Sequence, residues 1–223
     1  MMIKDNLKRI EATLKPGVRL VAVSKYQPIA ALHEAYDAGQ RAFGESHVQE
    51  LVVKHEALPK DVEWHFIGHL QTNKVKYMAS FVSLIHSVDS LKLLKEINKQ
   101  ALKAGRVIDV LLQLHVAAEE TKFGLTQHEV VEMLESDDFI ALKNVRVVGL
   151  MAMATNTEDE EQVAMEFESV RQFYHVLKDG YFSGKPEFKE ISMGMSGDYL
   201  IAQKYESTLV RVGSSIFGER IYE

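Results

Sequence analysis

One unit recurs along the chain: a short apolar or β-branched run, a polar turn, and a stretch with apolar residues at helical spacing. An amphipathic segment, Asp5–Leu14, predicts one extra helix before the first run. The runs predict eight strands, at Val18–Lys25, Arg41–Ser46, Trp64–His69, Ser83–Asp89, Asp109–Ala117, Arg146–Ala154, Phe188–Ser196 and Leu209–Phe217. Strands that alternate with helices favour parallel pairing.

Two of the helices between these strands have recognisable starts. Ser90 occupies an N-cap position, and apolar residues follow it on one helical face until Gly105, which is typical of a helix end. Thr157 and Glu160 have the spacing of a capping box. We therefore expect the next long helix to begin at Thr157.

Eight such units in 223 residues predict one closed (β/α)8 barrel, a single domain that spans residues 1–223. The chain has four prolines and no Gly/Ser-rich or low-complexity stretch, so nothing indicates a linker. An open doubly wound sheet would give the same alternation. No G-x-G-x-x-G motif follows the first strand, which argues against the dinucleotide-binding form of that fold.

Composition narrows the function classes. Apolar residues make up 46% and charged residues 26%, as in ordinary globular proteins, and 26 basic against 32 acidic side chains give a net charge of −6. A surface with this balance lacks the positive field that nucleic-acid binding needs. The absence of cysteine excludes disulfides, thiolate nucleophiles and Cys-ligated zinc, and it fits a reducing compartment.

The chain also lacks targeting and assembly signals. Met1–Leu14 has no uninterrupted apolar core, so it does not resemble a signal peptide. No run approaches the roughly 20 apolar residues of a membrane span, and no stripe indicates a coiled coil. We expect a cytoplasmic monomer with no nucleic-acid or membrane partner.

Lys25 is the first candidate for chemistry because it closes the apolar run Val21-Ala-Val-Ser-Lys25. In a (β/α)8 barrel the active site is built at the C-terminal ends of the strands. With the inward parity of Val21 and Val23, Lys25 would point into the barrel mouth. Burial lowers the pKa of an amine and makes it a nucleophile toward carbonyl groups. The alternative is a strand-end lysine that reaches solvent.

The last two predicted strands end in turns rich in Gly and Ser, Ser192-Met-Gly-Met-Ser196 and Arg211-Val-Gly-Ser-Ser215. Small residues let backbone N–H groups approach an anion, although turn geometry alone selects the same residues. Barrels commonly bind phosphate after the last two strands, and closure would put this cradle beside Lys25. An amine near a phosphate site indicates a phosphorylated aldehyde or ketone, and pyridoxal phosphate fits that description.

Arg211 precedes Gly213 by two residues and therefore shares its face of the strand. If its fixed positive charge meets the pyridine nitrogen of such a ligand, it disfavours ring protonation and weakens the cofactor as an electron sink. Carbanion chemistry would then be poorly supported. The alternative is an arginine paired with a carboxylate inside the barrel.

Several specific motifs occur in a fixed order over nearly the whole chain: Val21-Ala-Val-Ser-Lys25, Phe43-Gly-Glu45, His65-Phe-Ile-Gly-His-Leu-Gln-Thr-Asn-Lys74, His86-Ser-Val-Asp-Ser90, Glu119-Glu-Thr-Lys-Phe-Gly124, Gly149-Leu-Met-Ala-Met153, Ser192-Met-Gly-Met-Ser196 with Asp198, Val210-Arg-Val-Gly213 and Ile216-Phe-Gly218. Together they resemble the pyridoxal phosphate homeostasis protein family, also called the YggS/PROSC family.

This resemblance implies a barrel similar to the N-terminal domain of alanine racemase. It also implies that this chain carries pyridoxal 5′-phosphate as a Schiff base on Lys25. It implies Arg211 as the partner of the ring nitrogen. It places phosphate contacts at Ser192, Met193, Ser196, Gly213 and Ser214. Family members are regarded as binders and regulators of free cofactor that affect vitamin B6 and amino-acid pools, with no established catalytic turnover.

Two positions depart from the family pattern. The family usually has Gly-Glu-Asn after the second strand, whereas this chain has Gly44-Glu45-Ser46, which removes an amide contact to the ring or backbone. The usual Gly-Ser-Thr before the last strand is Glu206-Ser207-Thr208. We expect that second change to alter a turn and not the ligand.

The sequence favours cofactor binding without turnover. A two-base racemase needs an acid/base group on each face of the cofactor, and in alanine racemase-like enzymes one comes from an added β-domain and a partner subunit. This chain ends at Glu223, just after the eighth predicted strand, so we expect no such domain. An open face would admit water and suit transfer of the cofactor to apo enzymes that depend on it.

Other functions stay open. A Schiff-base lyase or aldolase for a phosphorylated sugar would use Lys25 with Glu45 or His69 as proton shuttle, and a racemase-like activity on an amino acid is related to it. A metal hydrolase would need His69, His86 and His115 to converge. An interaction scaffold with a vestigial pocket is the third alternative.

Overall fold

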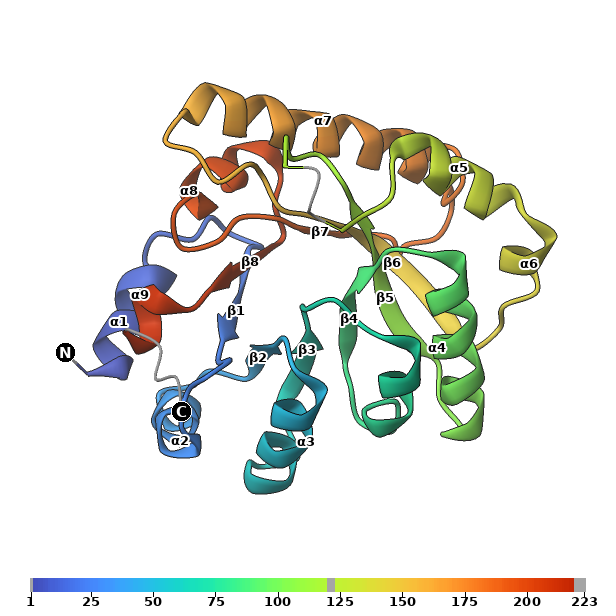
Figure 1. The fold of residues 1–223 in the computed structure, drawn as a ribbon. Coiled ribbons are helices and arrows are strands. Elements are labelled where there is room, and N and C mark those ends of the chain that lie inside the picture. Colours follow the sequence, from blue (N-terminus) through green and yellow to red (C-terminus); the bar gives the residue numbers. More distant parts are fainter. Residues whose placement is uncertain (1, 120–122, 219–223) are drawn as a thin grey trace.

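The computed structural model describes residues 2–119 and 123–218 and shows a closed barrel of eight parallel strands in the order β1 to β8 (Figure 1). Because β1 pairs with β8, the open sheet is excluded. Each predicted strand is present, at β1 Arg19–Val23, β2 Ala42–Glu45, β3 Glu63–Phe66, β4 Leu84–Val88, β5 Ile108–Leu114, β6 Val145–Ala152, β7 Glu190–Ser192 and β8 Leu209–Val212.

Helices surround the barrel and follow its strands (Figure 1). The α-helices are α1 Ile3–Glu11, α2 Ile29–Asp37, α3 Val48–Ala57, α4 Leu91–Lys103, α5 Gln127–Glu135, α6 Asp137–Ile140, α7 Glu160–Asp179, α8 Tyr199–Ala202 and α9 Ser214–Phe217. Two 3-10 helices, η1 Thr72–Tyr77 and η2 Gln203–Tyr205, complete the set. In the described ranges, no helix has the length and apolar character needed to cross a membrane.

Strand ends are where the sequence prediction is least accurate, because the runs extend into the turns that follow the strands. The last run was wrong from Gly213 onward, since β8 ends at Val212 and α9 follows in place of the expected strand. The Ile216 and Phe217 N–H groups donate to the Gly213 carbonyl, and Ile216 packs into the core. A helical turn therefore satisfies the backbone and buries the apolar side chain together.

One of the two expected helix starts is confirmed. Ser90 caps α4, and its Oγ accepts from the Leu93 N–H at 3.3 Å. The expected start at Thr157 is wrong by two residues, because the cap of α7 is Asp159. Asp159 Oδ1 accepts from two N–H groups of the first turn, whereas Thr157 only receives the N–H of Asp159.

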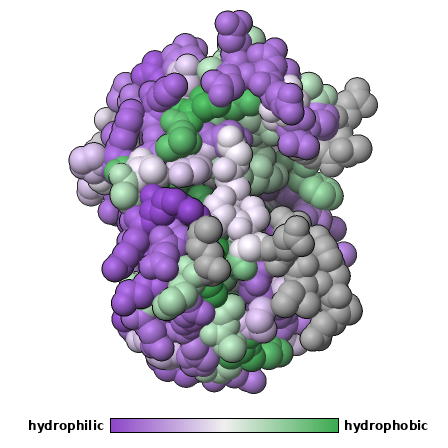
Figure 2. Space-filling model, turned by 90° about the vertical axis from the view of Figure 1, so that its left-hand side faces the viewer, coloured by the Kyte–Doolittle hydropathy of each residue, from purple (hydrophilic) through white to green (hydrophobic). Residues whose placement is uncertain are grey.

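The apolar core has two parts. The larger one lies between the barrel and the surrounding helices and includes Phe43, Trp64 and Phe167. The smaller one fills the barrel itself with six side chains: Val21, Leu84, Leu111, Val148, Met151 and Leu209. On the side of α1 and α8, the outer surface is mainly hydrophilic, with apolar side chains in small separate patches (Figure 2).

Candidate functional site

The C-terminal end of the barrel brings the first and last strands together. β1 pairs with β8 in the register Ala22↔Val212, so Val23 and Gly213 come next to each other. A methyl group on Gly213 would lie 3.1 Å from the Val23 carbonyl oxygen, so the two strand ends approach closely. Lys25 follows in the turn after β1 and is half-buried. Closure thus puts Lys25 and the Gly213 loop at neighbouring strand ends, as the sequence predicts.

The loops after β7 and β8 meet at three of the predicted phosphate contacts. The Gly213 N–H donates to Ser196 Oγ at 3.4 Å, and Ser214 Oγ donates to the same oxygen at 3.3 Å. Gly194 shapes the first loop: its φ is +94°, and a Cβ there would collide with Tyr199. The three contact residues keep solvent exposure, and their mutual hydrogen bonds are long. Their polar groups are therefore available to an anion.

The other two predicted phosphate contacts lie deeper. Ser192 is fully buried inside the barrel, and its Oγ accepts from Arg211 at 2.6 Å and lies 2.8 Å from His86 Nδ1. The Met193 side chain is also fully buried and packs in the core outside the barrel. The structure therefore groups Ser192 with Arg211, away from the exposed Ser196 cluster.

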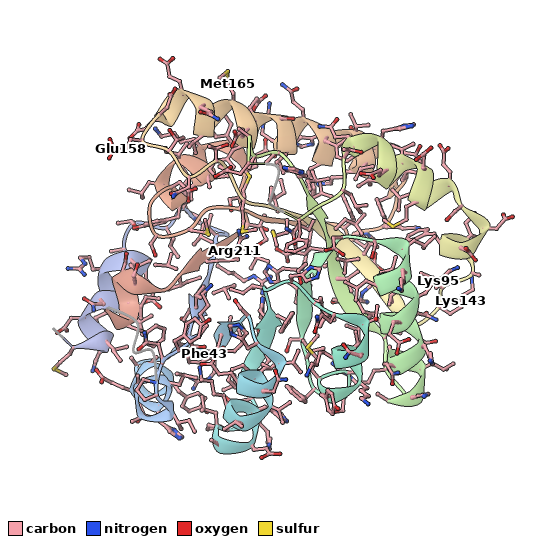
Figure 3. The ribbon with its side chains drawn as sticks, viewed as in Figure 1. Phe43, Lys95, Lys143, Glu158, Met165 and Arg211 are labelled. Atoms are coloured by element: carbon pink, nitrogen blue, oxygen red, sulfur yellow. The ribbon has the colours of Figure 1, made fainter. Side chains whose placement is uncertain are left out.

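Arg211 is a buried cation that points into the barrel (Figure 3). Only 3% of it is exposed, and its guanidinium donates to Ser192 O at 2.8 Å, Ser192 Oγ at 2.6 Å and Ala152 O at 3.0 Å. Burial lowers the pKa of Arg211 to about 10, and the negative charge of Asp198 opposes that shift. In the described part of the chain no carboxylate is hydrogen-bonded to it, unlike the ion-paired alternative.

Two neutral histidines extend the polar network from Arg211 across the barrel. His86 Nε2 lies 2.8 Å from His65 Nδ1, and both rings are fully enclosed. Burial lowers the pKa of both, and for His86 the neighbouring His65 and Arg211 add to the effect. One proton arrangement gives each of these contacts a donor and an acceptor: Ser192 Oγ donates to His86 Nδ1, and His86 Nε2–H donates to His65 Nδ1.

This histidine pair was missed as part of the site. The sequence motifs contain both residues, but the only role predicted for either was that of His86 as a metal ligand. The available signal is strand parity, because His86 is two residues after Leu84, which points into the barrel from β4. Parity does not predict the contact itself, which depends on barrel closure.

The three histidines of the metal-hydrolase alternative lie in separate surroundings. His86 is inside the barrel, His69 Nδ1 lies 3.1 Å from Asp89 Oδ2, and His115 Nε2 lies 3.1 Å from the Glu119 carbonyl. Across residues 2–119 and 123–218, no group of three or more His, Cys, Asp or Glu side chains is arranged to hold a metal ion.

Glu45, a proton shuttle in the lyase alternative, is completely buried beside β1. Its Oε1 accepts from Ser24 Oγ at 2.6 Å and from Lys54 Nζ at 2.8 Å. Burial raises the pKa of Glu45 to about 7, and the Lys54 ammonium opposes that shift. The Glu45 carboxyl therefore hydrogen-bonds to Ser24, the residue before Lys25.

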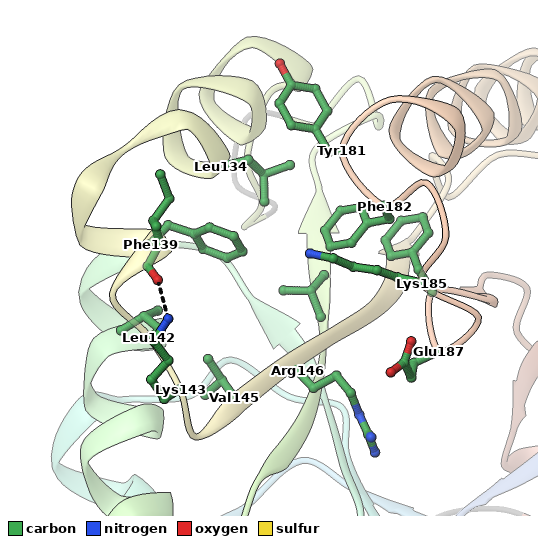
Figure 4. Close-up of a pocket in the computed structure, with 13 residues that line it drawn as sticks. Leu134, Phe139, Leu142, Lys143, Val145, Arg146, Tyr181, Phe182, Lys185 and Glu187 are labelled. Carbon is green, nitrogen blue, oxygen red and sulfur yellow. Dashed lines mark hydrogen bonds between the residues drawn. The ribbon is translucent and has the colours of Figure 1, made fainter.

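A cavity of about 400 Å³ lies outside the barrel, between α5–α6 and the chain that follows α7 (Figure 4). Phe139, Val145 and Phe182 form its apolar wall, with Lys143 and Lys185 nearby. None of the predicted site residues lines it, so it is separate from the Lys25 end of the barrel.

Sequence comparison gives a consistent set of relatives. The family described as "Alanine racemase, N-terminal domain" matches residues 2–221. A pyridoxal phosphate homeostasis protein from Aquifex aeolicus is 42% identical over 205 residues, which cover 92% of this chain and 88% of the relative. The protein of that name from Vibrio alginolyticus is 40% identical over 211 residues, again 92% and 88% of the two chains.

Solved structures agree with these relatives. PipY of Synechococcus elongatus, solved without pyridoxal phosphate, has a TM-score of 0.90 and 34% identity, covering 97% of this chain and 100% of PipY. PipY with pyridoxal phosphate bound has a TM-score of 0.87. Alanine racemase from Bartonella henselae, 14% identical with a TM-score of 0.73 over 59% of its length, shares the fold. The chain belongs to the pyridoxal phosphate homeostasis protein family, whose barrel is that of the alanine racemase N-terminal domain.

Proposed function

We propose that this protein binds pyridoxal 5′-phosphate as a Schiff base on Lys25 and serves in the intracellular homeostasis of that cofactor, without catalytic turnover. Relatives that bear this name, and a relative solved with the cofactor bound, support the proposal. The absence of cysteine fits a cytoplasmic location. The protein acts as a monomer with no nucleic-acid or membrane partner.

Each part of the ligand has a counterpart at this end of the barrel. Ser196, Gly213 and Ser214 bind the phosphate, together with the backbone of Met193. Arg211 faces the ring nitrogen, and Ser192, also a predicted phosphate contact, holds the guanidinium. Pyridoxal phosphate supplies the aldehyde with which the Lys25 amine condenses.

The observation that carries the proposal is the state of Arg211. Its three hydrogen bonds to Ser192 and Ala152 use three of the five guanidinium N–H donors, and no acceptor among residues 2–119 and 123–218 takes the other two. The lone pair of a pyridine nitrogen can accept from such a donor, and a guanidinium does not give up its proton to it. The ring then stays unprotonated and stabilises carbanions poorly, which favours storage over turnover.

The proposal is tested by titration with pyridoxal phosphate while the visible Schiff-base absorbance is followed. Wild-type protein should saturate at about one ligand per chain, and Lys25→Arg should give no band, because a guanidinium keeps the charge but cannot condense. Lys92→Arg, on the exposed side of α4, is the matched control and should behave as wild type. An unchanged band in Lys25→Arg would overturn the assignment.

Cofactor transfer to apo enzymes is a separate part of the proposal. If the loaded protein transfers its cofactor directly, an apo pyridoxal-phosphate enzyme should regain activity faster than the cofactor dissociates from the loaded protein. Reactivation at the off-rate would mean that transfer passes through free solution. Turnover of amino acids or phosphorylated sugars by the loaded protein would instead favour the racemase or lyase alternatives.

A further inference from the structure

The turn that carries Lys25 has an unusual backbone. Tyr26 has φ +61°, in the left-handed region that side chains other than Gly, Asn and Asp rarely adopt. Within the described ranges, Glu206 is the only other non-glycine residue with positive φ. A strained residue directly after the reactive lysine requires contacts that hold it there.

Those contacts come from charged side chains on β2 and α3. The peptide group before Lys25 presents the Ser24 carbonyl, which accepts from Lys54 Nζ at 2.6 Å. The peptide group after Lys25 presents the Tyr26 N–H, which donates to Glu50 Oε1 at 2.6 Å. Both peptide groups that flank Lys25 are therefore bonded to an ionisable side chain.

Lys54 joins these contacts into one cluster. Its Nζ also donates to Glu45 Oε1 at 2.8 Å and to Glu50 Oε1 at 2.6 Å, and its side chain is only 3% exposed. Ser24 Oγ donates to the same Glu45 oxygen. A buried ammonium that makes three hydrogen bonds in fixed directions defines the positions of its partners more strictly than a surface ion pair does.

The cluster has more acid than base. One ammonium faces two carboxyls, and Glu45 Oε2 is enclosed without a hydrogen-bond partner. Such an arrangement is expensive as a means of stabilising the fold, because apolar side chains would fill the same space without desolvating charge. A local function for it is therefore the better explanation.

We propose that Glu45, Glu50 and Lys54 are positioning residues that clamp the turn at Ser24 and Tyr26 and so aim Lys25 at its ligand. This inference rests on the proposed function, because the lysine that it positions is the one that condenses with pyridoxal phosphate. The cluster holds both flanking peptide groups, and neither of these hydrogen bonds uses the Lys25 side chain.

The test compares Glu50→Ala with Glu50→Gln. Glu50 lies on α3 with part of its side chain exposed, so alanine should be tolerated there. Alanine removes the acceptor for the Tyr26 N–H but leaves the Lys54–Glu45 pair in place, whereas glutamine keeps an acceptor oxygen. Glu56→Ala, at an exposed glutamate on the same helix, controls for the loss of one negative charge. Thermal unfolding of each variant checks the fold.

The first measurement needs no ligand. Amide hydrogen exchange of Tyr26 should be about tenfold or more faster in Glu50→Ala and within about twofold of wild type in Glu50→Gln, as expected for loss of one charge-assisted hydrogen bond. Equal exchange in all variants would overturn the inference whether or not the cofactor binds.

The second measurement uses pyridoxal phosphate. Glu50→Ala should bind it about tenfold more weakly, and the circular dichroism of the Schiff-base band should shrink, because the lysine is no longer fixed in one direction. Glu50→Gln should restore both properties. Wild-type affinity and dichroism in Glu50→Ala would overturn the inference, whereas failure of the wild-type protein to form the band would overturn the proposed function and leave the exchange result to decide the clamp.

Discussion

At the scale of single residues, Arg211 carries most of the argument. Its guanidinium is held by two carbonyl groups and one hydroxyl, all neutral, at the end of the barrel where Lys25 lies. Sequence parity predicts that Arg211 faces inward. It does not predict that Ser192 accepts a hydrogen bond from Arg211, because that contact depends on how β7 pairs with β8, and β7 is only three residues long.

Arg211→Lys tests the role of the planar fork. A lysine ammonium cannot reach the Ser192 and Ala152 carbonyls together in the same geometry, so the charge loses its fixed position. We expect pyridoxal phosphate to bind about tenfold to a hundredfold more weakly, as for loss of one hydrogen bond to a charged group. Arg171→Lys on α7 is the control, and equal affinities of the two variants would contradict the assignment.

Glu206, which lies outside the site, has a strained backbone conformation. The family usually has glycine there, and Glu206 adopts the left-handed φ of +64° while its carboxylate contacts Arg171 and His175. Glu206→Gly and Glu206→Ala both remove those contacts, but only glycine relieves the strain. The unfolding free energy of Glu206→Gly should therefore exceed that of Glu206→Ala by about 1 kcal/mol in urea titrations. No difference would mean that the turn relaxes.

At the scale of elements, strands β3, β4, β7 and β8 share one buried polar network. It runs from Arg211 through Ser192 and His86 to His65. The residues of each contact lie far apart in the sequence, so only the closed barrel brings them together. Lys54 of α3 was not identified from the sequence, because lysine side chains are almost never buried.

The histidine pair predicts a specific pH dependence of stability. Burial lowers the native-state pKa of His65 and His86, so below about pH 6.5 the unfolded chain binds protons that the folded chain does not. The free energy of unfolding should therefore fall as the pH drops, by up to about 1.4 kcal/mol per pH unit for each ring. His86→Gln should have a shallower slope between pH 6.5 and 5. An identical slope would contradict the neutral pair.

At the scale of the whole molecule, barrel closure creates the site. β1 and β8 are separated by nearly the whole sequence, yet their paired ends put the Lys25 turn beside the Gly213 loop. The eight strand–helix units in 223 residues favoured this closure, whereas their alternation alone also fits an open sheet. The ends of the strands were not predictable to the residue, because Ile216 and Phe217 continue the apolar pattern from β8 into a helix.

Site-specific chemistry tests the central claim most directly. The protein is incubated with pyridoxal phosphate, reduced with borohydride to fix any Schiff base as a stable adduct, and analysed by intact mass and peptide mapping, with Lys25→Ala alongside. We expect one adduct per chain, confined to Lys25 and absent from the variant. Labelling scattered over surface lysines and unchanged in Lys25→Ala would contradict it.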